Sequence, residues 1–224
     1  MGFRLGISSW TFPWSIGVPG HPAPFNPLRP TDLVKKAREF GVRVVQVADN
    51  LPLHKLSPRQ LQELKETAEE CGVELEVGTR GLAAEHLLAY LEIAVSLRAH
   101  LLRTIPVITE TGSADVGEIT RRLEEVLPRF AAAGVAIALE NYEACPARDL
   151  ARLVRSFASP YLGICLDTVN NLGALEPPAY VLAELGPYTI NLHIKDFVIK
   201  RIETKMGFSV TGAPAGSGLL DIPN

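Results

Sequence analysis

Short apolar runs alternate with longer amphipathic stretches from one end of this chain to the other. The apolar runs, which predict strands, cover residues 3–8, 42–47, 73–77, 100–106, 135–139, 161–166 and 188–194. The stretches between them, which predict helices, cover residues 31–40, 57–71, 82–97, 116–133, 146–158 and 177–185. Local signals agree, because Ser57-Pro58 is typical of a first helical turn and Gly134 of a helix end. Strands that alternate with helices in this way predict a parallel sheet.

Two parallel-sheet architectures fit this alternation: an open doubly wound sheet and a (β/α)8 barrel. Residues 10–14, Trp-Thr-Phe-Pro-Trp, stand where a dinucleotide-binding sheet carries glycines. A phosphate-binding P-loop motif is also absent from the sequence. We therefore expect an α/β fold of the TIM-barrel type. No break in composition indicates a second domain, and residues 1–224 are expected to form a single one.

The eighth strand–helix unit is missing from this pattern. The residues after Ile194 include many glycines and prolines, and a complete barrel takes about 250 residues. We expect this segment to supply a loop and the start of a helix, so either the chain is truncated or the barrel is left open at one edge with something else covering it. An open strand edge offers a surface through which copies of the chain can associate into a homo-oligomer.

Composition excludes several classes of partner. The 22 basic and 25 acidic residues are nearly balanced, which argues against nucleic-acid binding. No apolar run reaches the roughly 20 residues of a membrane helix, and the first residues lack the apolar core of a signal peptide. Cys71, Cys145 and Cys165 are far apart and form no CxxC pair. We therefore expect reduced thiols in a cytoplasmic protein that binds neither membranes nor nucleic acid.

Polar residues follow the predicted strands, at the end where barrel enzymes carry their active sites. Three of them, Glu140, Asp167 and His193, are separated by 27 and 26 residues, which is one strand–helix unit each. The equal spacing predicts that they lie at the same level of adjacent strands. Two carboxylates and one imidazole suit Mn²⁺, Mg²⁺, Co²⁺ or Zn²⁺. The alternative is that each residue caps a helix or pairs with a neighbouring charge.

Four short motifs give the chain a family resemblance: Gly-Ile-Ser-Ser-Trp10, Ala-Leu-Glu140-Asn, Cys-Leu-Asp167-Thr and Leu-His193-Ile-Lys-Asp. Their order and spacing resemble the xylose isomerase-like TIM-barrel superfamily. That group includes sugar phosphate isomerases and epimerases, ketose 3-epimerases, inosose dehydratases and endonuclease IV-type enzymes. The resemblance implies that Glu140, Asp167 and His193 are three of four ligands of a divalent metal. The fourth, a glutamate ending the eighth strand, would fall beyond Asn224.

The resemblance also implies a reaction: isomerisation or epimerisation of a sugar or sugar phosphate, by proton abstraction next to a carbonyl. A metal-stabilised enediolate would form, with Glu140 as the base. One departure is Asn170, which stands where the family often has histidine and can bind a substrate hydroxyl without transferring a proton. Lys195 or Arg80 would bind a substrate carboxylate or phosphate, or pair with neighbouring aspartates. Trp10 would lie against the sugar ring or pack beneath the loop at 17–30.

Three hypotheses about the function remain open on the sequence alone. The first is the metal-dependent isomerase or epimerase, with a dehydratase or other lyase on the same metal platform as a close variant. The second is a non-catalytic or partner-dependent barrel subunit, which the missing eighth unit favours. The third, DNA repair, is disfavoured by the net charge and by the small number of histidines.

Overall fold

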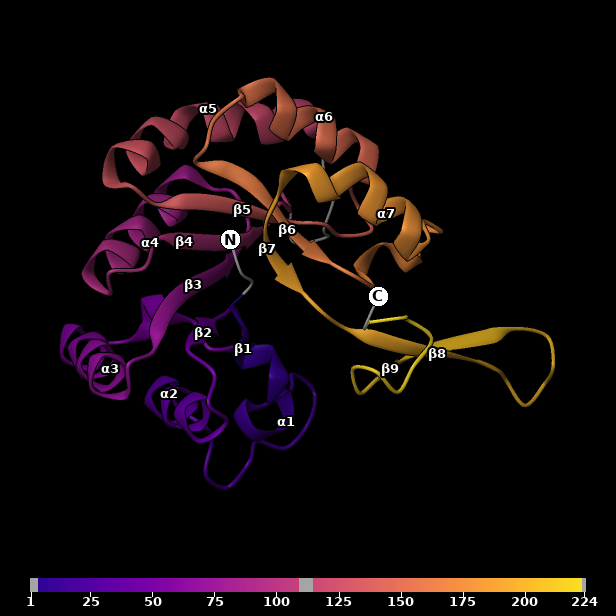
Figure 1. The fold of residues 1–224 in the computed structure, drawn as a ribbon, viewed down its shortest axis with the longest axis horizontal. Coiled ribbons are helices and arrows are strands. Elements are labelled where there is room, and N and C mark those ends of the chain that lie inside the picture. Colours follow the sequence, from indigo (N-terminus) through magenta and orange to yellow (C-terminus); the bar gives the residue numbers. More distant parts are fainter. Residues whose placement is uncertain (1–3, 109–114, 223–224) are drawn as a thin grey trace.

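The strands form one parallel sheet. A computed structural model describes residues 4–108 and 115–222. Within them the seven strands lie side by side in chain order. Their bounds are β1 Gly6–Ser8, β2 Val44–Val47, β3 Glu74–Arg80, β4 Leu101–Ile105, β5 Ala136–Glu140, β6 Leu162–Asp167 and β7 Thr189–His193. The sheet curls so that its edge strands, β1 and β7, turn toward each other (Figure 1). This confirms an α/β fold of the TIM-barrel type, of which the described residues form seven parallel strands.

Helices cover the outer face of the curled sheet (Figure 1). Their bounds are α1 Pro13–Ile16, α2 Pro30–Glu39, α3 Pro58–Cys71, α4 Ala84–Ser96, α5 Val116–Ala133, α6 Ala147–Phe157 and α7 Pro178–Leu185. The predicted end signals operate as expected. Ser57 and Gln60 form a capping box at the start of α3, and Gly134 ends α5 in a left-handed conformation with φ 70°.

The hydrophobic core lies between the helices and the outer faces of the strands. Four helices contribute completely buried residues to this core: Leu33, Tyr90, Phe130 and Leu150.

The inward-facing side of the sheet includes polar residues, and Gln46 on β2 donates a hydrogen bond to Asn191 on β7 across the barrel. That contact shows that the two ends of the curled sheet approach each other closely.

The expectation for the segment after Ile194 is wrong. Instead of a loop and a helix start, β8 (Asp196–Arg201) and β9 (Phe208–Ala213) form an antiparallel hairpin, with Ile199 opposite Val210. The physical reason is that residues 197–199 and three of the four residues at 208–211 are aromatic or β-branched, which favours strands. The hairpin projects away from the barrel and leaves the β7 edge uncovered by a strand (Figure 1).

Among the described helices, none combines the length and apolar character needed to cross a membrane.

Candidate functional site

Glu140 lies at the end of β5, and its carboxylate is almost completely buried. Oε2 contacts the guanidinium of Arg103 and lies 3.4 Å from His193 Nδ1, while Oε1 accepts a hydrogen bond from the Asn170 amide at 2.8 Å. Burial alone would raise the pKa of Glu140. The neighbouring His193 and the charge of Arg103 outweigh burial and lower that pKa to about 2. Glu140 is therefore ionised at neutral pH.

Asp167 ends β6, and its side chain is completely buried. Oδ1 accepts hydrogen bonds from the backbone amides of Val169 and Asn170, at 2.9 and 3.0 Å. Oδ2 forms an ion pair with Lys195 Nζ at 2.8 Å, yet it receives no hydrogen bond of good geometry from the described residues. Asp167 thus keeps one buried oxygen with capacity for a further ligand.

His193 ends β7 and is orientated by a hydrogen bond on its far side. Nε2 lies 2.8 Å from the side-chain oxygen of Gln46, and Nδ1 faces Glu140 Oε2. If Nε2 carries the proton, two acceptor atoms face each other at 3.4 Å, an arrangement that a cation between them would stabilise. Glu140 and His193 therefore offer donor atoms that face each other, which a divalent metal site needs.

The strand register corrects one sequence expectation, that the three residues lie at one level. Asp167 pairs with His193, but Glu140 pairs with Cys165, two residues before Asp167. Ligand atoms of Glu140, Cys165 and His193 all lie within 4.8 Å of one another. The structure therefore adds a thiol to the candidate donors.

Cys165 is a poor donor in its present state. Burial raises the pKa of its thiol well above the ordinary value, and the thiol lies in hydrogen-bonding contact with Asn191 Oδ1 at 3.2 Å. Metals bind the thiolate rather than the thiol, so Cys165 would have to lose a proton while buried beside the negative charge of Glu140. Glu140 is already ionised and needs no such step, so it is the better donor of the two. All three cysteines, Cys71, Cys145 and Cys165, are free.

The predicted substrate-binding residues fall into three groups. Lys195 and Asn170 join the cluster directly, since Nζ of Lys195 donates to Asn170 Oδ1 at 2.9 Å and also pairs with Asp167. Trp10 reaches it indirectly, because its indole N–H donates to Asp49, which accepts from Arg103. Arg80 instead lies over the ring of Tyr142, at 5.4 Å from its centre.

Sequence reasoning missed four polar residues that support this cluster from inside the strands: Gln46, Glu76, Cys165 and Asn191. Arg103 is 3% exposed, and its charge balances Glu140 and Asp49. Burial raises the pKa of Glu76 on β3. The sequence carried one signal for these residues, namely a polar residue inside an apolar run. In a parallel strand such a residue indicates a side chain that faces the inside of the barrel.

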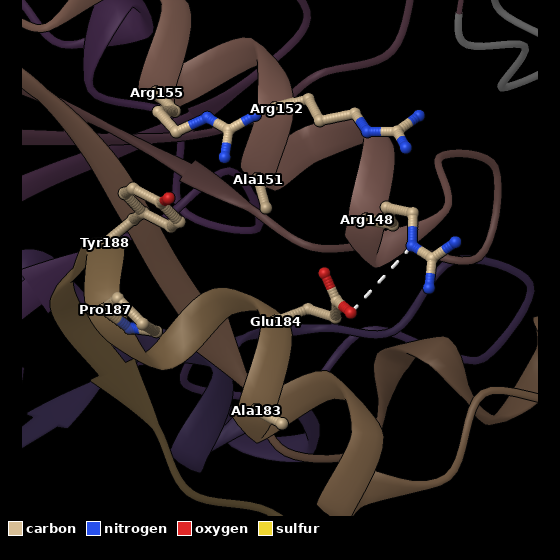
Figure 2. A pocket seen from close by; sticks show the side chains of 8 residues that line it. All are labelled: Arg148, Ala151, Arg152, Arg155, Ala183, Glu184, Pro187 and Tyr188. Carbon is tan, nitrogen blue, oxygen red and sulfur yellow. Dashed lines mark ion pairs between the residues drawn. The ribbon is translucent and has the colours of Figure 1, made fainter.

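Two other polar features lie apart from this cluster. His54, His86 and Tyr90 form a group at the start of α4, where His54 Nδ1 contacts the Tyr90 hydroxyl at 2.9 Å. A groove between α6 and α7 has a cavity volume of about 390 Å³, and Figure 2 shows three arginines of α6 beside it. Arg148 faces Glu184 across that groove at 3.9 Å. Neither feature contributes a residue to the strand-end cluster.

Comparisons with known proteins agree with the geometry. A family model described as "Xylose isomerase-like TIM barrel" matches residues 34–224. The chain is similar to the 3-oxo-isoapionate decarboxylase of Pectobacterium atrosepticum, with 38% identity over 219 residues that cover 97% of this chain and 77% of the relative.

Solved structures show the same fold at lower identity. A xylose isomerase-like TIM-barrel protein from Mycobacterium smegmatis, in complex with magnesium, has a TM-score of 0.68 and 17% identity over 86% of this chain and 74% of its own. A D-psicose 3-epimerase determined in the presence of D-fructose has a TM-score of 0.66 and 14% identity over 85% and 72%. At these identities the likeness establishes the fold alone.

Proposed function

The chain belongs to the xylose isomerase-like TIM-barrel family, and from that membership we propose a divalent-metal-dependent enzyme that decarboxylates a 3-oxo sugar acid. The 38% identity to a 3-oxo-isoapionate decarboxylase, across 97% of the chain, carries the choice of reaction. The metal would be held by Glu140, Asp167 and His193. Mn²⁺, Mg²⁺, Co²⁺ and Zn²⁺ all accept this donor set.

Loss of carbon dioxide from a 3-oxo acid needs an electron sink. The bond between the carboxylate carbon and its neighbour breaks, and its electron pair moves toward the keto oxygen to give an enediolate. A bound divalent ion supplies Lewis-acid stabilisation of that negative charge. The carbon that lost carbon dioxide then takes up a proton.

The residues of the chain have separate roles in this scheme. Glu140 is ionised and fixed by Arg103, so it serves as a ligand rather than as the proton donor. Lys195 is the cation nearest the cluster that is still partly exposed, with a side chain 45% accessible. It attracts the anionic substrate and has a proton to give to the carbanionic carbon. Asn170, which is hydrogen-bonded to both Glu140 and Lys195, orientates a substrate hydroxyl.

A sugar isomerase or epimerase is the second candidate, and one observation favours it. An ionised, buried carboxylate such as Glu140 is suited to remove a proton next to a carbonyl. Both reactions pass through the same type of enediolate, so the two candidates differ in the bond that breaks.

The test compares two substrates on one preparation. The protein loaded with Mn²⁺ is given 3-oxo-isoapionate, and carbon dioxide release is measured; in a second reaction, D-fructose is incubated in D₂O and deuterium incorporation is measured. We expect carbon dioxide release that is lost in His193→Ala and strongly reduced in Lys195→Met. Deuterium exchange without carbon dioxide release would replace this proposal with the isomerase, and the absence of both would overturn it.

A further inference from the structure

The side-chain amide of Gln46 lies between His193 and two polar residues deeper in the barrel. Its nitrogen donates to Glu76 Oε2 at 3.0 Å and to Asn191 Oδ1 at 3.2 Å. Its oxygen lies 2.8 Å from His193 Nε2. Gln46 is buried, so both ends of the amide depend on these protein partners.

The surroundings fix which end of the amide faces His193. Glu76 Oε2 also accepts a hydrogen bond from Asn191 Nδ2 at 3.0 Å, and with Glu76 as the carboxylate it has no proton to donate to Gln46. A reversed Gln46 amide would set its oxygen against Glu76 Oε2 and Asn191 Oδ1, with no proton between them. The amide oxygen must therefore point to His193.

This orientation of the Gln46 amide determines that Nε2 of the His193 ring carries a proton. An amide oxygen can only accept, so His193 Nε2 carries a proton. In the neutral ring the lone pair is then on Nδ1, the atom that faces Glu140 Oε2 at 3.4 Å. Metal-binding histidines are commonly held through their other nitrogen in this way, and the partner sets which nitrogen binds.

We propose that Gln46, orientated by Glu76 and Asn191, is a positioning residue that holds His193 as its Nε2–H tautomer and makes Nδ1 the metal-binding nitrogen. The inference rests on the metal site proposed above and extends it to residues that do not touch the ion. It also assigns a purpose to polar groups placed inside the barrel, where apolar side chains would otherwise fill the space.

The experiment uses Gln46→Met, which keeps the length of the side chain but removes the acceptor, and Glu76→Gln as a matched control that keeps an acceptor for the amide. The first readout is the tautomer of His193 in metal-free protein, from long-range proton–nitrogen NMR spectra of ¹⁵N-histidine-labelled protein, assigned with His193→Ala. The second readout is Mn²⁺ affinity by calorimetry. Circular dichroism establishes that each variant is folded.

We expect His193 to be Nε2–H in the wild type and to lose that preference in Gln46→Met. Mn²⁺ binding should weaken about 10–100-fold in Gln46→Met and by no more than about threefold in Glu76→Gln. A wild-type Nδ1–H tautomer, or wild-type affinity in folded Gln46→Met, overturns the proposal. If Gln46→Met does not fold, Asn191→Ala takes its place and the wild-type tautomer still decides.

A failure of the proposed function would give a different result from a failure of the positioning role of Gln46. If the wild-type protein binds no Mn²⁺, the metal-dependent reaction is excluded. A Gln46-dependent Nε2–H tautomer in the same samples would still support the positioning role.

Discussion

The guanidinium of Arg103 lies against the carboxylate of Glu140, and the two side chains are only 3% and 1% exposed. The same guanidinium donates to Asp49 at 2.8 Å and to the backbone oxygen of Thr79 at 3.2 Å. Arg103 thus joins β3, β4 and β5 with the loop after β2. It fixes Glu140 in place and supplies a positive charge that balances this buried carboxylate.

Replacing Arg103 with methionine should destabilise the fold strongly. Glu140 would remain buried without its cation, and removing one partner of a buried ion pair costs about 3–5 kcal/mol. Urea denaturation at pH 7 measures the free energy of unfolding of the wild type and Arg103→Met. The matched control is Arg121→Met on α5, whose exposed ion pair with Glu118 should contribute almost nothing. Equal stabilities for the two variants would show that Arg103 does not support Glu140.

The low pKa of Glu140 predicts a specific pH dependence of stability. Its pKa is about 2 in the folded protein and about 4.3 in an unfolded chain. The folded state therefore binds this proton less readily, so ionised Glu140 stabilises the fold above about pH 4.3. That contribution is lost as the pH falls from there toward 2.

Glu140→Gln removes this titration, so the variant tests it directly. The free energy of unfolding of the wild type, measured in EDTA, should fall more steeply than that of Glu140→Gln as the pH drops below about 5. Parallel pH profiles for the two proteins would show that the pKa of Glu140 is not lowered by folding.

Metal addition should separate the two possible donor sets. A ligand at 100 times its dissociation constant stabilises a protein by about 2.7 kcal/mol, and for a domain of this size each kcal/mol raises the melting temperature by about 2–4 °C. We expect Mn²⁺ to raise the melting temperature of the wild type and of Cys165→Ser alike. Asp167→Asn should lose most of this shift. If instead only Cys165→Ser lost the Mn²⁺-induced rise in melting temperature, the metal site would be assigned to the thiol.

Much of the fold follows from local signals in the sequence. The predicted strand at 135–139 and the strand β5 overlap almost completely, because an apolar run bounded by Gly134 and the polar Glu140-Asn141 defines its ends. The helix α3 begins and ends where Ser57 and Gly72 predict. Clustering of Glu140, Asp167, His193, Asn170 and Lys195 follows from their positions at the ends of parallel strands.

The remaining features depend on strand register, which local patterns do not specify. A shift of register at Ile164 and Cys165 sets Asp167 beside His193 while Glu140 faces Cys165. The partners Gln46 and His193 are 147 residues apart, and only closure of the sheet brings them together. The hairpin at 196–213 was missed because its many turn-forming neighbours outweighed two short strand-forming runs.

Asp196 provides a last prediction, about the segment that follows the hairpin. Its carboxylate is buried and accepts hydrogen bonds from the backbone amides of Gly216, Gly218 and Leu220, at 3.1, 2.7 and 3.1 Å. These contacts fold residues 214–220 around one side chain. Gly218 has to be glycine, because a Cβ there would overlap the Asp196 carboxylate and the Phe197 carbonyl oxygen.

Asp196→Ala leaves those three amides without their acceptor, so their hydrogen exchange should accelerate by about tenfold or more, since this segment would open locally. Gly218→Ala should produce the same change by displacing the carboxylate, whereas Lys200→Ala on the exposed part of β8 should not. Amides of β5, such as that of Leu139, serve as the internal reference. Because Asp196 has no contact with Glu140, Asp167 or His193 among its hydrogen bonds, Mn²⁺ affinity should stay the same in all three variants. Unchanged exchange in Asp196→Ala would mean that the hairpin, rather than this carboxylate, orders the segment.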